Sequence, residues 1–348
     1  MTGSSVIDWN LARTVAHRVG GKGPTIGRAG AMQAVEELRA GAATAVHIVR
    51  DITELQADAS PDAVRVVDRS RWVDANAAAF ASVLDPLTSR MKRDNATGAV
   101  GARFAGAEMG AALGFLSARV LGQYELFTAK DAEPHLLLVA PNIVDVEQRL
   151  GVRSSDFRLW VCLHEETHRV QFTAVPWLGP WLREQIASTI DDLTVEPRDL
   201  GRRMRQVAAA VVGALRGVDV VKALEQFMSA HEREVLDRLT AVMSLLEGHA
   251  DVVMDAVGSD VIPTVDTLRE RLNERRTTPQ GTEALVRRLL GMEAKLAQYR
   301  AGAQFVRSVI DQVGMSGFNR VWDGPESLPS RDELHAPAKW VARVGAES

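Results

Sequence analysis

Residues 157–172 of this chain read FRLWVCLHEETHRVQF and contain the pattern His-Glu-x-x-His at His164, Glu165 and His168. In a helix, residues i and i+4 lie on one face, so both imidazoles can reach a single metal ion. The glutamate after the first histidine lies close enough to act as a general base. The alternative interpretation is an ordinary amphipathic helix with two surface histidines.

The residues around this motif favour a buried helix. Leu159 and residues 161–163 form an apolar run immediately before His164. Ser155 and Asp156 are candidate N-cap residues, and Pro176 is expected to end the helix. A metal site needs its ligands on a rigid element of this kind.

A third metal ligand is predicted in residues 245–251, LLEGHAD. Glu247 and Asp251 are spaced i, i+4, so a helix places both on one face. Glu247 is the candidate ligand, and Asp251 is expected to accept the outer N–H of a ligating histidine. The alternative is a solvated acidic pair. It is disfavoured because unpaired carboxylates are costly among apolar neighbours, which here are Val242, Met243, Leu245, Leu246, Val252, Val253 and Met254.

The other histidines are less suitable as ligands. His249 lies about 200° around a helix from Glu247, and His231 would lie about 24 Å from it along one helix. Four further histidines lack partners at metal-binding spacing and are expected to be structural or exposed: His17, His47, His135 and His335.

At these residues the sequence resembles the glutamate-liganded zincin metallopeptidases, typified by thermolysin. The resemblance implies that His164, His168 and Glu247 hold zinc, that Glu165 activates water, and that Asp251 supports a histidine. The separation from His168 to Glu247 is longer than in thermolysin. An additional helical segment is therefore expected between the two ligand helices.

A second resemblance covers most of the chain. The sequence is similar to a bacterial family of mainly helical proteins regarded as zinc-dependent metalloproteases or hydrolases, some of which are labelled as associated with deazaflavin coenzyme biosynthesis. The resemblance rests on the zinc motif followed by Arg169 and on residues 67–76, 122–125, 138–142, 246–248 and 337–341. It implies a zinc hydrolase and defines no substrate.

Composition is consistent with an intracellular enzyme. The chain has 348 residues and a formal net charge of −4, so no general attraction to nucleic acid or anionic membranes is expected. Its single cysteine, Cys162, excludes an intrachain disulfide framework; burial in apolar surroundings is expected for it. Neither a secretory signal nor a membrane-length apolar stretch is recognised, so a cytoplasmic location is predicted. The oligomeric state is left open.

The predicted fold is mainly α and zincin-like. Helices are predicted over residues 9–19 and 27–55, one or two more are predicted within 61–91, and a helical seam is expected over 282–313. This seam fits packing within the chain better than a dimer contact.

We expect one large domain over residues 1–348. It would contain an N-terminal helical lobe (1–95), a zinc-binding core (96–275) and a C-terminal lobe with a long helix and a tail (276–348).

One region is predicted to be β. Residues 120–128 and 135–143 flank a turn-like segment and suggest a small antiparallel hairpin beside the zinc helix. Residues 136–140 are the candidate edge strand for pairing with an extended substrate. The alternative is a hairpin that only covers the core.

The favoured function is a zinc-dependent metallopeptidase in which Glu165 is the general base. Candidate oxyanion donors are Tyr124, Tyr299, His249 and His335.

Two alternatives stay open. One is a noncatalytic scaffold or regulatory protein stabilised by Zn²⁺, with Asp255 or His249 as a fourth ligand. The other is a zinc hydrolase of a small amide metabolite. The expected partner is accordingly a peptide or a small amide, and the donor set also suits other divalent metals.

Overall fold

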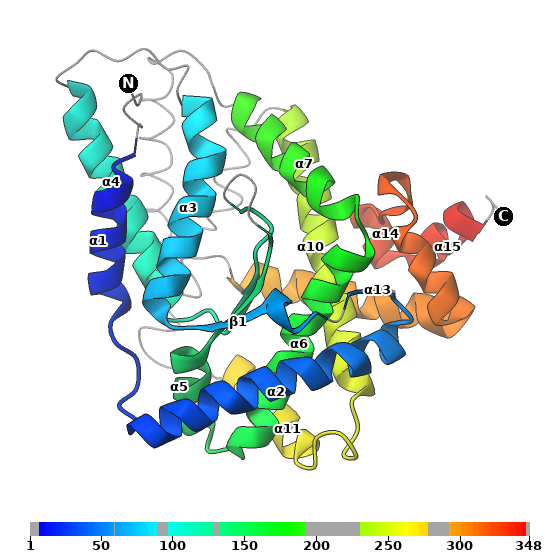
Figure 1. Cartoon of the computed structure of the whole chain (residues 1–348). Helices are drawn as coiled ribbons and strands as arrows, with labels where there is room; N and C mark the ends of the chain where they lie inside the picture. Colours follow the sequence, from blue (N-terminus) through cyan, green and yellow to red (C-terminus); the bar gives the residue numbers. More distant parts are fainter. Residues whose placement is uncertain are drawn as a thin grey trace. The chain divides into compact units, whose positions relative to one another are not determined.

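The computed structural model describes residues 7–58, 60–88, 97–128, 133–192, 230–277 and 292–345. It is mainly helical with one small sheet, which confirms the predicted fold class (Figure 1). The chain divides into two compact units. Unit 1 comprises Met1–Ile52, Gln56–Ala174 and Val257–Leu268, and unit 2 comprises Thr53–Leu55, Val175–Ala256 and Arg269–Ser348.

The first two helices of unit 1 have bounds close to those predicted from the sequence. Its elements are α1 (Trp9–Gly20), α2 (Arg28–Thr53), a 3₁₀ turn (Pro61–Ala63), β1 (Val64–Val67), α3 (Arg69–Thr88), α4 (Thr97–Ser117), β2 (Gly122–Tyr124), β3 (Leu136–Val139), α5 (Ala140–Leu150) and α6 (Ser154–Ala174). The prediction that 61–91 contains one or two helices is confirmed by α3. Val64–Val67, before that helix, is a strand because it pairs with a distant strand.

The sheet has the strand order β1-β3-β2. β2 pairs with β3 in the antiparallel sense, with Gly122 opposite Leu138, which confirms the predicted hairpin. β1 pairs with β3 in the parallel sense, with Val64 opposite Leu136, so the sheet is mixed. Parallel neighbours require a long crossover connection, and local sequence patterns do not reveal such a pairing.

The prediction that residues 136–140 form an edge strand was wrong. β3 is the central strand, all four of its residues are buried, and Ala140 already belongs to α5. A continuous apolar run is typical of a strand covered on both faces. The edges of the sheet are β1 and β2.

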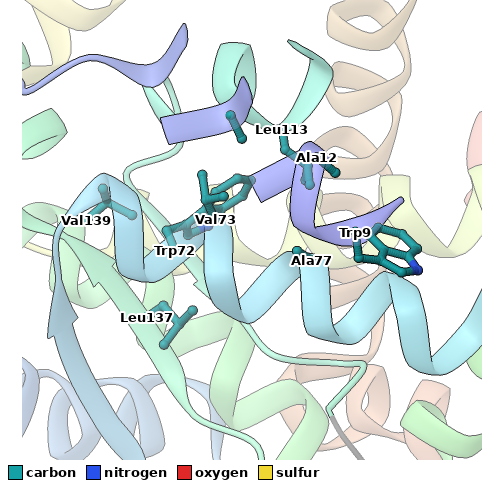
Figure 2. Close-up of a cluster of buried hydrophobic side chains, with 9 residues drawn as sticks. Trp9, Ala12, Trp72, Val73, Ala77, Leu113, Leu137 and Val139 are labelled. Atoms are coloured by element: carbon teal, nitrogen blue, oxygen red, sulfur yellow. The ribbon is translucent and has the colours of Figure 1, made fainter. Parts of the chain in front are cut away.

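A buried apolar cluster joins α1, α3 and α4 to this sheet (Figure 2). Trp9 from α1 and Trp72 from α3 are its largest side chains, and Leu113 comes from α4. Leu137 and Val139 of the central strand complete it. The cluster fixes the sheet against the helices, and so sets the position of the edge strand β2.

Close packing between α1 and α4 depends on glycine. Three glycines of α4, spaced four residues apart, face α1: Gly106, Gly110 and Gly114. A Cβ atom on Gly110 would lie 2.4 Å from the carbonyl oxygen of Ala12. The two backbones therefore approach more closely than any larger residue would permit.

Unit 2 is built on two long helices. Its described elements are α7 (Leu178–Asp192), α10 (Ala230–Ala256), most of α11 (Val265–Thr277), α13 (Met292–Phe318), 3₁₀ turns at Asn319–Trp322 and Pro325–Ser327, α14 (Arg331–His335) and α15 (Pro337–Gly345). Residues 278–291, which include the start of the predicted seam, lie outside the described residues. Within α13, Ala303 and Val306 of that seam are buried.

α10 and α13 also meet through glycines. A Cβ atom on Gly248 would lie 2.2 Å from the backbone of Gly302, and one on Gly302 would lie 1.9 Å from the carbonyl oxygen of Ser244. This contact fixes the rotation of α10 about its own axis.

Among the described residues, no helix is long and apolar enough to cross a membrane.

We predict that Gly110→Ala destabilises the protein while Gly101→Ala on the same helix does not. The added methyl at Gly110 overpacks the α1–α4 contact, at a cost of about 1–3 kcal/mol. Gly101 has no atom within 4 Å of its would-be Cβ, so alanine should stabilise by up to about 1 kcal/mol. Thermal unfolding of the two variants measures the difference, and equal melting temperatures would contradict it.

Candidate metal-binding site

Helix α6 carries the His-Glu-x-x-His motif through the interior of unit 1. It runs from Ser154 to Ala174 and ends just before Pro176, as predicted. The prediction that Ser155 or Asp156 caps the helix was wrong, because both lie within its first turn. The carboxylate of Asp156 instead accepts hydrogen bonds from the backbone N–H and the hydroxyl of Thr264, at 3.1 and 2.8 Å.

A buried group of charges holds α6 to two other helices. The guanidinium of Arg158 donates two hydrogen bonds to Glu147 of α5, at 2.6 and 2.9 Å, and one to Glu37 of α2 at 2.6 Å. We call these three residues the Arg158 cluster. Burial alone would lower the pKa of Arg158, but the hydrogen bonds and charges of Glu147 and Glu37 outweigh it and raise the pKa.

The two motif histidines lie on one face of α6, one turn apart. Their ring centroids are 4.9 Å apart with the rings nearly perpendicular. One ring nitrogen of His164 lies within 4.8 Å of one of His168. Zinc–nitrogen bonds are about 2.0–2.1 Å long, so small side-chain rotations bring both nitrogens to a single ion.

The neighbours of the two imidazoles orient their rings. His168 Nδ1 lies 3.1 Å from Oε1 of the buried Gln171. In the tautomer that is protonated at Nδ1, this N–H donates to Gln171, and Nε2 is the atom that would bind a metal. The ring of His164 stacks on Trp160, 5.8 Å away and almost parallel to it. Gln171 was not among the predicted site residues, although its i+3 spacing from His168 could have indicated it.

Glu165 packs against the edge strand β2. Its side chain is 9% exposed. A Cβ atom on Gly122 would lie only 2.5 Å from Glu165 Cδ, so glycine is required where this carboxylate passes the strand. Tyr124, two residues further along β2, stacks on Phe172 of α6 at 5.5 Å. Phe172 is one turn beyond His168, so β2 lies along the histidine face of the helix.

The apolar role expected for Cys162 is confirmed. The thiol is fully buried, and its Sγ lies 3.5 Å from the carbonyl oxygen of Leu38 on α2. Burial, together with the charges of Glu166 and Glu165, raises the pKa of this thiol. A protonated thiol is neither a nucleophile nor a metal ligand.

In unit 2, Glu247 and Asp251 occupy one face of α10, one turn apart and partly buried. The neighbouring positions are committed to other contacts. Gly248 packs on α13, and His249 is fully buried against the rings of Phe318 and Trp322. These contacts keep the two carboxylates on a separate face of α10.

His164 and His168 of unit 1 and Glu247 of unit 2 each offer one ligand atom for a metal ion. Two imidazoles and one carboxylate are the donor set of many catalytic zinc sites. Within the described parts of the chain, no other group of three or more histidine, cysteine, aspartate or glutamate residues could do so.

The remaining candidates lie elsewhere. His231 belongs to the same continuous helix as Glu247, and it is exposed. Asp255 forms an ion pair with Arg307. His335 is exposed on α14, and the side chain of Tyr299 lies outside the described residues. Of the four predicted oxyanion donors, Tyr124 is the one that lies along the histidine face of α6.

A family model for zincin-like metallopeptidases matches residues 7–341. The chain belongs to the zincin-like metallopeptidase family. Membership implies a bound metal ion, typically zinc, and the residues at His164, His168 and Glu247 suit it. No curated protein matches the chain.

This zincin-like protein also resembles a solved structure. A crystal structure from Chloroflexus aurantiacus, described as that of a proposed hydrolase with a novel fold, is 31% identical in sequence with a TM-score of 0.71. The match covers 98% of this chain and 100% of that one. Together with the family match, this supports a hydrolase.

We predict that Arg158→Leu strongly destabilises the protein, whereas Arg149→Gln does not. Removing the guanidinium leaves Glu147, 4% exposed, as a buried charge without its main partner, which costs about 3–5 kcal/mol. Arg149, 64% exposed, forms a surface pair with Asp145 whose loss costs below about 1 kcal/mol. Urea unfolding measures both variants. A similar small loss in each would mean that the Arg158 cluster does not stabilise α6.

Proposed function

We propose that this protein is a zinc-dependent metallopeptidase in which His164, His168 and Glu247 hold the metal and Glu165 is the general base. The observation that carries the proposal is the pair of histidines one turn apart on α6, with Gln171 beside Nδ1 of His168. The family match over residues 7–341 supports the same chemistry.

Bound zinc would supply Lewis acidity, lowering the pKa of a water molecule and polarising a carbonyl oxygen. Glu165 accepts the proton of the attacking water and delivers it to the leaving amine. Its contact with Gly122 restricts the side chain to one region beside the histidines. Restricting the base in this way lowers the entropy lost on reaching the reactive arrangement.

The edge strand β2 is the best candidate for binding an extended peptide. It pairs with β3 on one side, and among the described residues no strand pairs with its other side. Its residues Gly122 and Tyr124 face Glu165 and Phe172. A peptide added to this edge by backbone hydrogen bonds would lie along the face of α6 that carries the general base.

Support for the two histidines is divided between two residues in this proposal. Gln171 Oε1 lies within hydrogen-bond distance of His168 Nδ1. Asp251, one turn beyond Glu247 on α10, is proposed as the acceptor for the outer N–H of a ligating histidine. Such outer partners fix the tautomer of a ligand and raise its basicity.

We predict that the purified protein contains about one zinc ion per chain and that His164→Ala and Glu247→Ala lose it. His47→Ala and Glu234→Ala are matched controls, because both residues are exposed on helices and neither belongs to the metal group. Elemental analysis after dialysis measures the metal. Zinc retained by Glu247→Ala would remove that residue from the ligand set, and absence of metal after reconstitution would contradict the proposal.

We predict that Glu165→Gln keeps its zinc but loses about a hundredfold to ten-thousandfold in kcat on a peptide library. The amide has nearly the shape of the carboxylate but cannot accept the proton. Glu108→Gln makes the same chemical change at an exposed position of α4 and should leave the rate unchanged. Undiminished turnover by Glu165→Gln would exclude it as the base.

Assays on small acyl amides, run beside the peptide library, separate the amide hydrolase and the scaffold from the peptidase. Cleavage of small acyl amides without cleavage of peptides would identify an amide hydrolase. A scaffold would cleave neither, and its melting temperature would fall strongly on removal of zinc.

A further inference from the structure

Unit 1 contains a cavity of about 620 Å³ that the proposed reaction does not use. It lies between α2, the segment around β1, the residue preceding β3, and α6. Its charged and titratable lining is Arg39, Asp62, Arg65, His135, Glu166 and Arg169. Cavities of this size are typical of sites for small molecules.

Three of the charged groups already have partners. Arg169 and Glu166 are both almost fully buried and form an ion pair at 2.6 Å. Burial raises the pKa of Glu166, and Arg169 opposes that effect. The ring of His135 lies 3.3 Å from Glu125 Oε2. These contacts leave little net charge on the inner wall of the cavity.

The other two arginines of the lining differ from Arg169 in having no ion-pair partner among the described residues. Arg39 and Arg65 are exposed at the cavity, on α2 and β1 respectively, and neither forms an ion pair with any carboxylate in the described part of the chain. Asp62 offsets one of the two positive charges. The lining therefore has a net excess of positive charge carried by guanidinium groups.

We propose that this cavity binds a small organic anion, with its carboxylate or phosphate group held by Arg39 and Arg65. Guanidinium groups bind both kinds of oxyanion through paired hydrogen bonds. Ser60 also lines the cavity, and its hydroxyl is a further candidate donor. The carbon skeleton of the ligand would lie on the apolar wall formed by Ala42, Val46 and Val64.

The anion site is distinct from the histidine pair. Glu166 lies about 200° and Arg169 about 140° around α6 from His164, given about 100° per residue. The cavity lining includes neither His164 nor His168. Helix α6 thus presents the motif histidines on one face and the cavity on another.

The test is calorimetric titration of the full-length protein with inorganic phosphate and, separately, with succinate. We expect saturable binding of at least one of them, weakened about tenfold or more in the double variant Arg39→Gln/Arg65→Gln. The matched control is Arg18→Gln/Arg103→Gln, which removes two exposed arginines of unit 1 outside the cavity and should bind as the wild type does. Thermal unfolding verifies that both variants are folded.

Because a metal ion also attracts anions, the titrations are repeated after removal of metal with a chelator. Binding that persists and still depends on Arg39 and Arg65 supports the proposal. Preference for phosphate would indicate a phosphate ester as the ligand, and preference for succinate a carboxylate. Binding of neither anion, loss of all binding with the metal, or equal binding by the cavity variant and its control would overturn it.

Discussion

The structure depends on burying one charged helix. α6 passes through unit 1 with Arg158, Glu165, Glu166 and Arg169 all less than a tenth exposed. A charge buried without a partner is costly, so buried charges are expected to pair. The Arg158 cluster meets this requirement near the start of the helix by joining it to α5 and α2. Further along, Arg169 and Glu166 neutralise one another.

With α6 held in place by these ion pairs, other elements of unit 1 pack against it. The apolar cluster of Figure 2 holds the sheet against α1, α3 and α4, and β2 then lies against Glu165. Glycine at position 122 permits that approach. This restriction suits the role of general base proposed for Glu165, because misplacement by about 1 Å can cost two orders of magnitude in rate.

The two faces of α6 follow opposite chemical rules. On one face, His164 and His168 offer lone pairs that suit a cation. On another, the cavity of Arg39 and Arg65 offers N–H donors that suit an anion. The α6 residues that line the cavity lie more than a quarter turn around the helix from the two histidines. The two sites therefore occupy different faces of the same helix.

Much of the candidate site could be predicted from the sequence because it is local. The i, i+4 spacing of His164 and His168 places them on one face in any helix, and the apolar run before them correctly predicted burial. The acidic pair on α10 follows from the same rule. The assignment of Glu247 as the third ligand stays a prediction.

Features that join distant residues were decided by tertiary structure alone. Val64–Val67 became a strand through parallel pairing with β3, which made β3 the central strand. The approach of Gly122 to Glu165 and the union of Arg158 with Glu37 join residues far apart in the chain. The sequence by itself determined which residues share a helix face, because that depends only on the helical repeat. Which strands pair, and which charges meet, depended on the packing of the whole unit.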